Sequence, residues 1–212
     1  MALQEDAYSG KSMERRRELL SIAVELFAKN GYHKTKISDI VCQAGVAQGT
    51  FYWHFKSKEA IALEIIANGR EEISKVISQG YRTHSGTVVD MVQASEALLK
   101  NLFRFASENR YLMELLLGSG ASDEAIRQAA SEARLEMEQA FRRNIERAME
   151  LEMLPQTIDP KLRAAMLMSL IEGMIARWLF GPQAPESPLP DITLDEISAQ
   201  TARFEFFGLL GI

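Results

Sequence analysis

Side chains suited to binding nucleic acid are concentrated between positions 48 and 58. Gln48 and Thr50 carry hydrogen-bonding groups of the kind that read base edges, while Tyr52 and His54 offer a hydroxyl and a ring N–H to a sugar-phosphate backbone. Gly49 has no side chain, which lets a helix approach a duplex closely. This order of residue types predicts a short helix placed in the major groove of DNA.

Lysines flank the helices on both sides of this segment. Lys56 and Lys58 lie where the following helix is expected to start, and Lys34 and Lys36 lie where the preceding one starts. Thr35 is expected to cap that preceding helix with its hydroxyl. Helix amino ends carry free N–H groups and partial positive charge, so both places favour a phosphate anion.

Two short helices must position these side chains. We expect them over residues 36–44 and 48–55, joined by a turn at 45–47, and neither is long enough to be stable alone. Phe51 and Phe55 lie four residues apart and therefore share one helix face. That face is expected to pack inward with Ile37, Ile40, Val41 and Val46.

Helical periodicity dominates the remaining sequence, and no run alternates long enough to predict a strand. Thr193 and Glu196 have the spacing of a capping box, and Ser122 is expected to cap the long seventh helix. The sequence predicts an all-α fold with helices over 13–29, 36–44, 48–55, 57–79, 87–108, 111–117, 122–151, 161–180 and 193–210. We place an N-terminal tail and helix-turn-helix domain at 1–57 and a second helical domain at 58–212.

Charge is distributed unevenly along the 212 residues. Residues 1–58 hold 9 Lys and Arg against 6 Asp and Glu, whereas residues 59–212 hold 15 against 23. A net charge of -5 argues against a protein that coats nucleic acid everywhere. The asymmetry instead favours a local phosphate-binding footprint on an acidic body, although a solvated helix face would give the same skew.

The cysteine content, the first residues and the apolar stretches indicate where in the cell the protein acts. Cys42 is the only cysteine, so no intrachain disulfide can form, and a buried packing role is expected for it. The start, MALQEDAYSGK, is acidic and lacks the apolar core of a signal peptide. The longest weakly polar stretch, 164–176, falls short of the roughly 18 residues of a membrane span. We expect a cytoplasmic protein without membrane contact.

The stretch LFAKNGYHKTKISDIVCQAGVAQGTFYWHFKSKEAI resembles the DNA-binding domain of the TetR/AcrR family of bacterial transcriptional regulators. The similarity covers about residues 14–65 and lies in G-Y at 31–32, A-G-V at 44–46, G-T-F-Y at 49–52 and H-F-x-S-K-E at 54–59. Carried over by position, it implies phosphate contacts at Thr35, Tyr52, His54 and Lys58. It implies base-reading positions at Lys36, Gln48, Gly49 and Thr50.

Two positions depart from the family pattern. Ala47 stands where the family usually has serine, so the reading helix loses a side-chain cap worth about 1 kcal/mol. Gln48 replaces a frequent lysine and exchanges a charge for an amide suited to adenine. The second change alters the expected operator sequence rather than the capacity to bind DNA.

The last two helices are the expected dimer interface, because two DNA readers must be held about one helical turn apart, roughly 34–36 Å. Two helices from each subunit would form a four-helix bundle about a two-fold axis, as the resemblance also implies. Packing within one chain is the alternative. The stripes assigned to the interface are Ala165, Ser169, Glu172 and Ala176 on one helix and Ile197, Thr201, Phe204 and Gly208 on the other.

The fourth to eighth helices are rich in methionine and bulky apolar side chains. Methionine is flexible and polarizable, so an interior lined with it accepts varied apolar ligands, although the same stripes also fit an ordinary core. The resemblance implies a small inducer among these helices. The predicted lining is Met91, Phe103, Met113, Leu116, Met137, Phe141, Met166, Leu170 and Met174. His84, Arg104 and Arg110 are candidates for an anionic ligand end or, alternatively, solvated surface groups.

Three functions compete. The first is a homodimeric regulator, expected to be a repressor, that binds a palindromic operator and is released by a small apolar ligand. The second is a helical small-molecule binding protein without a defined operator, which only Ala47 supports. An enzyme is disfavoured because the histidines have no metal-ligand companions and no phosphate loop or nucleophile elbow is present, so no cofactor is expected.

Overall fold

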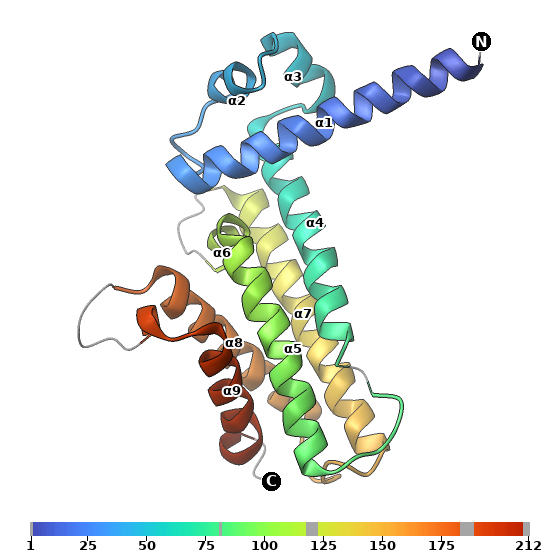
Figure 1. Cartoon of the computed structure of the whole chain (residues 1–212), viewed down its shortest axis with the longest axis vertical. Coiled ribbons are helices and arrows are strands. Elements are labelled where there is room, and N and C mark those ends of the chain that lie inside the picture. Colours follow the sequence, from blue (N-terminus) through green and yellow to red (C-terminus); the bar gives the residue numbers. More distant parts are fainter. Residues whose placement is uncertain (1, 81, 118–122, 183–188, 210–212) are drawn as a thin grey trace. The chain divides into compact units, whose positions relative to one another are not determined.

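Helices account for all the regular structure in the computed structural model, which describes residues 2–80, 82–117, 123–182 and 189–209. No strand occurs in these ranges, as the sequence predicts. The elements are α1 Ala2–Asn30, α2 Ile37–Gln43, α3 Gln48–His54, α4 Lys58–Ser78, α5 Val88–Glu108, α6 Arg110–Leu117, α7 Glu124–Glu150, α8 Pro160–Phe180, the 3₁₀ turn η1 Leu189–Asp191, α9 Leu194–Phe204 and the π-helix η2 Glu205–Leu209 (Figure 1).

Most helix ends follow the local signals in the sequence. The Thr193 hydroxyl accepts from the Glu196 N–H at 3.2 Å and the Glu196 carboxylate accepts from the Thr193 N–H at 3.1 Å, which confirms the predicted capping box. Gly31 ends α1 with φ +82° and Gly45 makes the turn after α2 with φ +63°, values that favour glycine. The backbone at these points therefore adopts the geometry that the residue types predict.

Four boundaries differ from the prediction. α1 begins at Ala2 rather than near Met13, because residues 2–9 are mostly good helix formers that continue the pattern. Asp123 caps α7 by accepting from the Ala125 N–H, whereas Ser122 lies outside the described residues. Lys36, not Thr35, occupies the cap position of α2. The last helix changes to a π-helix after Phe204 instead of running on to 210.

The chain divides into two compact units, residues 1–67 and 68–212. The division falls ten residues after the predicted 57/58 boundary because the first half of α4 belongs to the first unit. Ile61 there is fully buried, and Glu64 accepts hydrogen bonds from the Arg16 guanidinium of α1. The linking helix is therefore shared between the two units rather than marking the start of the second.

The core of the first unit is built around aromatic rings. Phe27 of α1 and Phe51 of α3 are fully buried, and the Phe51 and Phe55 rings lie 5.9 Å apart, so the predicted inward face of α3 is confirmed. The Arg16 guanidinium lies 4.7 Å from the centre of the Phe55 ring. Ile40 of α2 completes this core.

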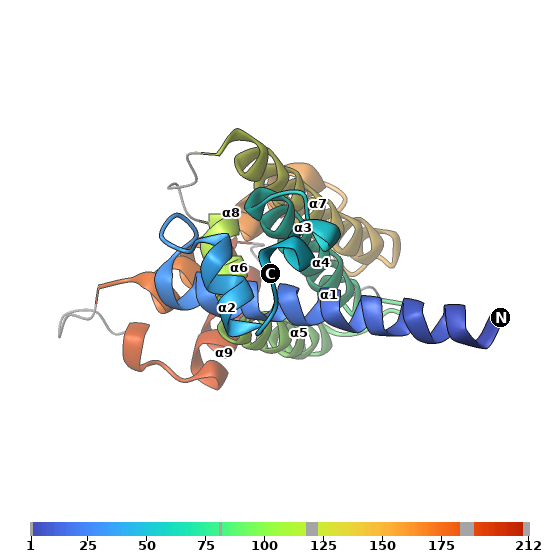
Figure 2. The ribbon, with the colours of Figure 1, turned by 90° about the horizontal axis from the view of Figure 1, so that it is seen from above.

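In the second unit α5 lies beside α9, and α7 lies beside α8 (Figures 1 and 2). The Phe103 ring of α5 meets the Trp178 ring of α8 edge to face at 6.0 Å. Among the described helices, none combines the length and the apolar character needed to cross a membrane. Fully buried side chains from four helices form the core, including Leu99, Phe103, Ile126, Ile171 and Ile197.

Candidate nucleic-acid interface and ligand pocket

The outer face of α3 is polar, aromatic and exposed. Gln48 and Gly49 are exposed, and the side chains of Tyr52 and Trp53 have exposed fractions of 51% and 66%. A Cβ added at Gly49 would meet no atom within 4 Å, so nothing inside the chain requires glycine there. Two large aromatic residues left in solvent on a helix that a buried phenylalanine anchors indicate an external partner.

The amino end of α3 lacks a side-chain cap. Ala47 occupies the cap position in an extended conformation, and it offers no side-chain hydrogen bond. The Thr50 N–H donates to the Ala47 carbonyl at 2.9 Å, and the half-buried Thr50 side chain lies one turn into the helix. The first backbone N–H groups of α3 therefore have no hydrogen-bond acceptor in the side chain at the cap position.

His54 and Lys58 carry basic groups whose pKa values are lowered. Burial, followed by the nearby charges of Arg16 and Arg15, lowers the pKa of the His54 imidazole below 6.5. Burial also lowers the pKa of the Lys58 ammonium. His54 is therefore mainly neutral at pH 7, and it can offer a ring N–H to a phosphate rather than a full charge.

Lys58 also orders the loop between α1 and α2. Its ammonium donates to the Tyr32 carbonyl at 2.7 Å and to the Thr35 carbonyl at 2.9 Å, and it lies 4.3 Å from the centre of the Tyr32 ring. Two of its three protons are used in these bonds, so one is left for a phosphate oxygen. The lysine thus combines a structural contact with a donor on the candidate surface.

Two predictions for α2 and the loop before it are wrong. Thr35 is 1% exposed, and its hydroxyl shares its one proton between the Gly31 carbonyl at 2.9 Å and the Leu26 carbonyl at 3.2 Å. A hydroxyl fixed in this way packs behind the surface and has no free face for a phosphate. Cys42 is exposed rather than buried, because α2 turns only Ile40 and Val41 into the core. Lys36 remains exposed at the start of α2.

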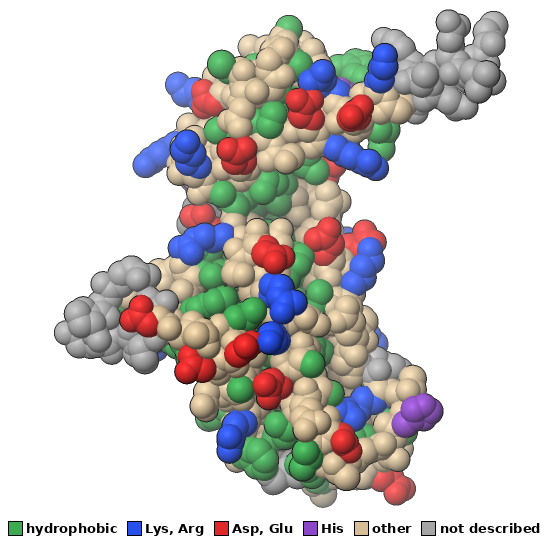
Figure 3. Space-filling view, viewed as in Figure 1, with side chains coloured by type: hydrophobic (Ala, Val, Ile, Leu, Met, Phe, Trp, Pro, Cys, Tyr) green, Lys and Arg blue, Asp and Glu red, His purple; other side chains and the backbone are tan. Residues whose placement is uncertain are grey.

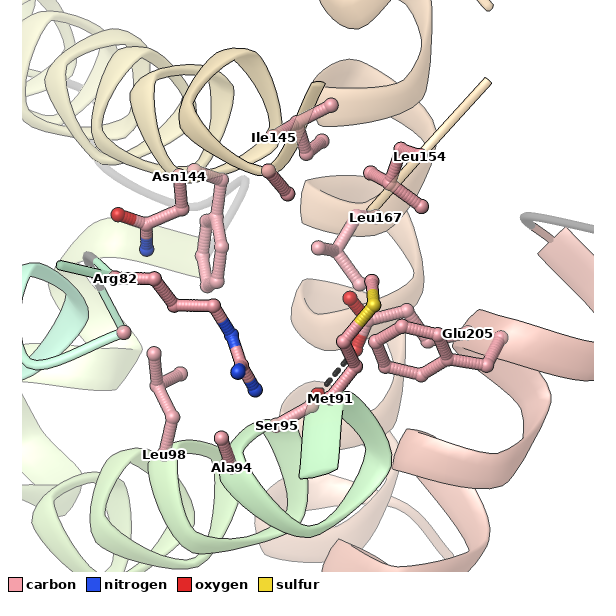
Figure 4. A pocket seen from close by; sticks show the side chains of 14 residues that line it. Arg82, Met91, Ala94, Ser95, Leu98, Asn144, Ile145, Leu154, Leu167 and Glu205 are labelled. Carbon is pink, nitrogen blue, oxygen red and sulfur yellow. Dashed lines mark hydrogen bonds between the residues drawn. The ribbon is translucent and has the colours of Figure 1, made fainter. Parts of the chain in front are cut away.

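A pocket opens into the second unit between α5, α7, α8 and the C-terminal segment (Figure 4). Its cavity volume is about 80 Å³, small beside the roughly 300–1,000 Å³ of most small-molecule sites. Most of its wall is apolar. The described residues that line it are Gly80, Arg82, Met91, Ala94, Ser95, Leu98, Phe141, Asn144, Ile145, Ala148, Leu154, Leu167, Glu205 and Phe206.

Only two of the nine predicted lining residues, Met91 and Phe141, lie on this pocket. Four others are buried in the helical core away from it: Phe103, Met113, Leu116 and Met137. His84, Arg104 and Arg110 do not line it either, and the Arg110 guanidinium instead lies 4.8 Å from the Phe180 ring. Residue type alone does not separate core packing from pocket lining.

The other three predicted ligand residues do not face this pocket. Leu170 and Met174 line an open groove between α8 and α9, and the Met166 side chain is 42% exposed. Because α8 is apolar on almost every side, its sequence pattern does not tell which face is covered. The groove is also lined by Gln200, Thr201, Arg203, Phe204, Phe207 and Gly208.

The predicted interface stripes divide between different surfaces. Phe204 and Gly208 lie on the α8–α9 groove, with Thr201 at its floor, 3% exposed. Ile197 is fully buried, since α9 packs that face on α5. Ala165, Ser169 and Glu172 instead face α7, where the Glu172 carboxylate accepts two bonds of 2.5 Å from Arg134. Ala176 is half-buried and lines neither groove.

The charged side chains of the first unit are of both signs on the face drawn in Figure 3. The positive groups relevant to DNA are therefore local: Lys36 before α2, Lys56 before α4, and Lys58 at the start of α4. They lie at the chain positions where helix amino ends already favour an anion. This agrees with a confined phosphate footprint rather than a uniformly basic surface.

Two family models match the chain in order. The model of the bacterial regulatory proteins of the tetR family matches residues 19–65, and the model of the C-terminal region of MAATS-type transcriptional repressors matches residues 92–187. The chain belongs to the TetR/AcrR family. This TetR-family protein is a transcriptional regulator and not an enzyme.

Relatives of this TetR-family regulator match it over most of its length. The HTH-type transcriptional regulator AcrR of Shigella flexneri is 27% identical over 182 residues, 82% of each chain. A solved putative TetR-family regulator from Syntrophomonas wolfei, 22% identical, has a TM-score of 0.73 over 94% of this chain and 97% of that one. FadR from Bacillus subtilis, solved in complex with stearoyl-CoA and 21% identical, has a TM-score of 0.72 over 92% and 98%. These two structures share the fold.

Proposed function

We propose that this TetR-family protein is a repressor that binds a palindromic operator as a homodimer and is released by a small, largely apolar ligand. The observation that carries the proposal is the outer face of α3, where Gln48, Tyr52 and Trp53 lie in solvent while Phe51 fixes the helix from behind. The match to the MAATS-type repressor model supports the sign of regulation. Such a protein acts in the cytoplasm, where operator DNA lies.

Each exposed group has a role in this proposal. Gln48 and Thr50 read base edges from the amino end of α3, and Gly49 lets the backbone approach the groove. Lys36 reaches a base edge or an adjacent phosphate from the start of α2. Tyr52, His54 and the remaining proton of Lys58 hold phosphate oxygens on either side of the groove. The buried Thr35 supports this surface from behind without touching DNA.

The dimer forms, in this proposal, through the α8–α9 groove, which includes Thr201, Phe204 and Gly208 of the predicted α9 stripe but none of the predicted α8 stripe. Phe204 and Phe207 have exposed fractions of 55% and 59%, and Met166 is 42% exposed. Exposed apolar side chains clustered on two adjacent helices favour self-association, which removes them from water. A two-fold axis through this face would pair α8 and α9 with the same helices of a second copy.

The pocket in the second unit receives the effector. Its apolar wall supports an apolar ligand, and FadR of Bacillus subtilis was solved with stearoyl-CoA, a ligand with a long apolar chain. Release from DNA requires that the ligand bind one state of the dimer more tightly than the other. The effect on operator affinity cannot exceed that difference.

The test of the proposal is selection of bound sequences from random duplex DNA, followed by titration of the enriched duplex at several salt concentrations. A repressor of this kind enriches a two-fold symmetric motif, and log K falls linearly with log salt, with a slope of roughly -0.9 for each phosphate neutralised. Thr50→Ala is the site variant, and Thr83→Ala, exposed in the loop between α4 and α5, is the matched control.

Featureless enrichment would favour the second function, a helical small-molecule binding protein without a defined operator. An affinity that does not change with salt would contradict phosphate binding at this surface. If Thr83→Ala lost as much binding as Thr50→Ala, α3 could not be assigned as the helix that reads the bases.

A further inference from the structure

A carboxyl group lies on the wall of the pocket at the junction of α9 and η2. Glu205 is the first residue of the π-helix, and it is 8% exposed. The Ser95 hydroxyl of α5 donates to its Oε2 atom (Figure 4). Among the described residues Ser95 is its only hydrogen-bond partner, so Oε1 has none. Single-turn π-helices often mark functional positions, because they redirect side chains.

The surroundings of Glu205 are almost entirely apolar. α7 contributes Phe141 and Ile145, and α8 contributes Leu167. Asn144 of α7 is the one amide on the described lining, and its Nδ2 atom donates to the Ile77 carbonyl at 3.0 Å. This wall therefore supplies Glu205 with neither a cation nor a further donor.

Arg82 is the only other charged residue on the described lining. Its Nη2 atom donates to the Asp90 carbonyl at 2.7 Å, in the first turn of α5. Burial raises the pKa of Glu205 to about 7, and only the Ser95 hydrogen bond opposes the rise. A guanidinium close to the carboxyl would have lowered that pKa instead. Among the described residues no ion pair joins Arg82 to Glu205, although the Arg82 side chain points into the same pocket (Figure 4).

A buried acid without a cation costs folding free energy, and packing alone gives no reason for it. An apolar residue of the same size would fit this wall with less cost. A ligand that brings a positive charge would supply the missing partner for this nearly buried carboxyl. A buried charge-assisted hydrogen bond is among the stronger polar contacts available to a small molecule.

We propose that the pocket takes amphipathic amines, whose ammonium group binds the Glu205 carboxylate while the hydrocarbon chain lies along Met91, Leu98, Phe141 and Leu167. The inference rests on the proposed function, and it names the chemical class of the effector. The ammonium N–H donates to Oε1, and Ser95 keeps its bond to Oε2. Where Glu205 carries a proton, that proton passes to solvent on binding, so the release approaches one proton per amine well below pH 7 and falls toward none above it.

An apolar carboxylate is the competing class. It would have to enter beside an acid that is itself close to ionisation. Arg82, which gives one of its five N–H groups to the Asp90 carbonyl, is the one cation on the described lining. Like charges in a low-dielectric site repel strongly. This arrangement favours the amine, and octanoate is the opposing arm of the test.

The experiment compares 1-octylamine, 1-octanol and octanoate, which share one chain length and differ in the end group. Isothermal titration calorimetry on the full chain gives the three affinities, for wild type and for Glu205→Gln. Repeating the amine titration in two buffers of different ionisation enthalpy counts the released proton. Glu132→Gln, the same change at an exposed site of α7, is the matched control.

We expect wild type to prefer octylamine over octanol and octanoate, and Glu205→Gln to lose about tenfold or more of its amine affinity. The control should retain it. Ser95→Ala keeps the carboxyl, so the amine preference should persist there even if Glu205→Gln folds poorly. In wild type the amine affinity should rise with pH through about 7, since ionised Glu205 is the binding form.

Several results would overturn the proposal. Octanoate bound at least as tightly as octylamine, with loss of that binding in Arg82→Gln, would assign the site to anions. Amine binding unchanged in Glu205→Gln, or no binding of any probe up to its solubility limit, would remove Glu205 as the anchor. Operator binding is measured on the same samples. If it is intact, only the ligand class falls and the proposed regulator stands.

Discussion

Replacing Glu205 by glutamine changes the pH dependence of folding, independently of any ligand. Glutamine keeps the size of the side chain and an acceptor for the Ser95 hydroxyl, but it has no charge to bury. The pKa of Glu205 is raised from 4.5 to about 7 by burial. A raised folded-state pKa means that the stability is fully present below about pH 4.5 and is lost as pH rises through about 7.

The magnitude follows from the two pKa values. Between 4.5 and about 7 the unfolded chain has released a proton that the folded chain still holds, and each pH unit in that window costs about 1.36 kcal/mol. The wild type therefore loses roughly 3 kcal/mol of unfolding free energy across the window. Glu205→Gln does not, so its stability relative to wild type should rise by about 2 to 3 kcal/mol between about pH 5 and pH 8.

Urea unfolding followed by far-UV circular dichroism measures this difference at a series of pH values. Protein concentration is held constant, because subunit association makes apparent stability depend on it. Glu132→Gln on the exposed face of α7 should follow the wild-type curve. Parallel curves for wild type and Glu205→Gln would refute the reasoning, since they would mean that this carboxyl ionises as freely in the folded chain as in water.

Four further outcomes follow from the site. Ala47→Ser restores a cap to α3 and should stabilise the first unit by about 1 kcal/mol in thermal unfolding; an unchanged Tm would mean that the amino end is satisfied in another way. Gln48→Ala should weaken binding to the enriched duplex about tenfold or more while leaving binding to shuffled duplex unchanged, and an equal loss on both would make the residue a phosphate contact. Phe207→Glu should give a monomer in sedimentation, whereas Val89→Glu, equally exposed but away from the groove, should stay a dimer. His54 has a lowered pKa, so operator affinity measured by fluorescence anisotropy should rise only as pH falls below about 6.5, and His54→Gln should abolish that rise.

The position and orientation of α3 could be predicted because several residues fix them independently. Phe51 and Phe55 at a spacing of four fix the inward face, and the glycines at 31 and 45 fix the chain reversals with positive φ values. The exposed positions then follow by elimination. The helix boundaries that failed, such as the start of α1, lie where good helix formers continue past any stop signal.

The pocket and the interface were less predictable for a physical reason. α8 presents apolar residues on nearly every side, so its pattern permits Leu170 and Met174 to face inward or outward. Only the packing of α9 against α5 decides between these arrangements. The sequence does contain a signal for Glu205. It is the one acid in the apolar run Phe204–Phe207, and an acid in such a run indicates a candidate buried site.

The π-helix joins two surfaces within a few residues. Glu205 and Phe206 belong to the pocket, while Phe207 and Gly208, with Phe204 before them, belong to the outer groove. Any ligand that moves Glu205 must also displace its covalent neighbours on the far side of the same short coil. By reciprocity, whatever docks on that outer side biases the ligand's affinity in equal measure. Under the proposed function, a substitution here that changes the inducer would also change subunit pairing.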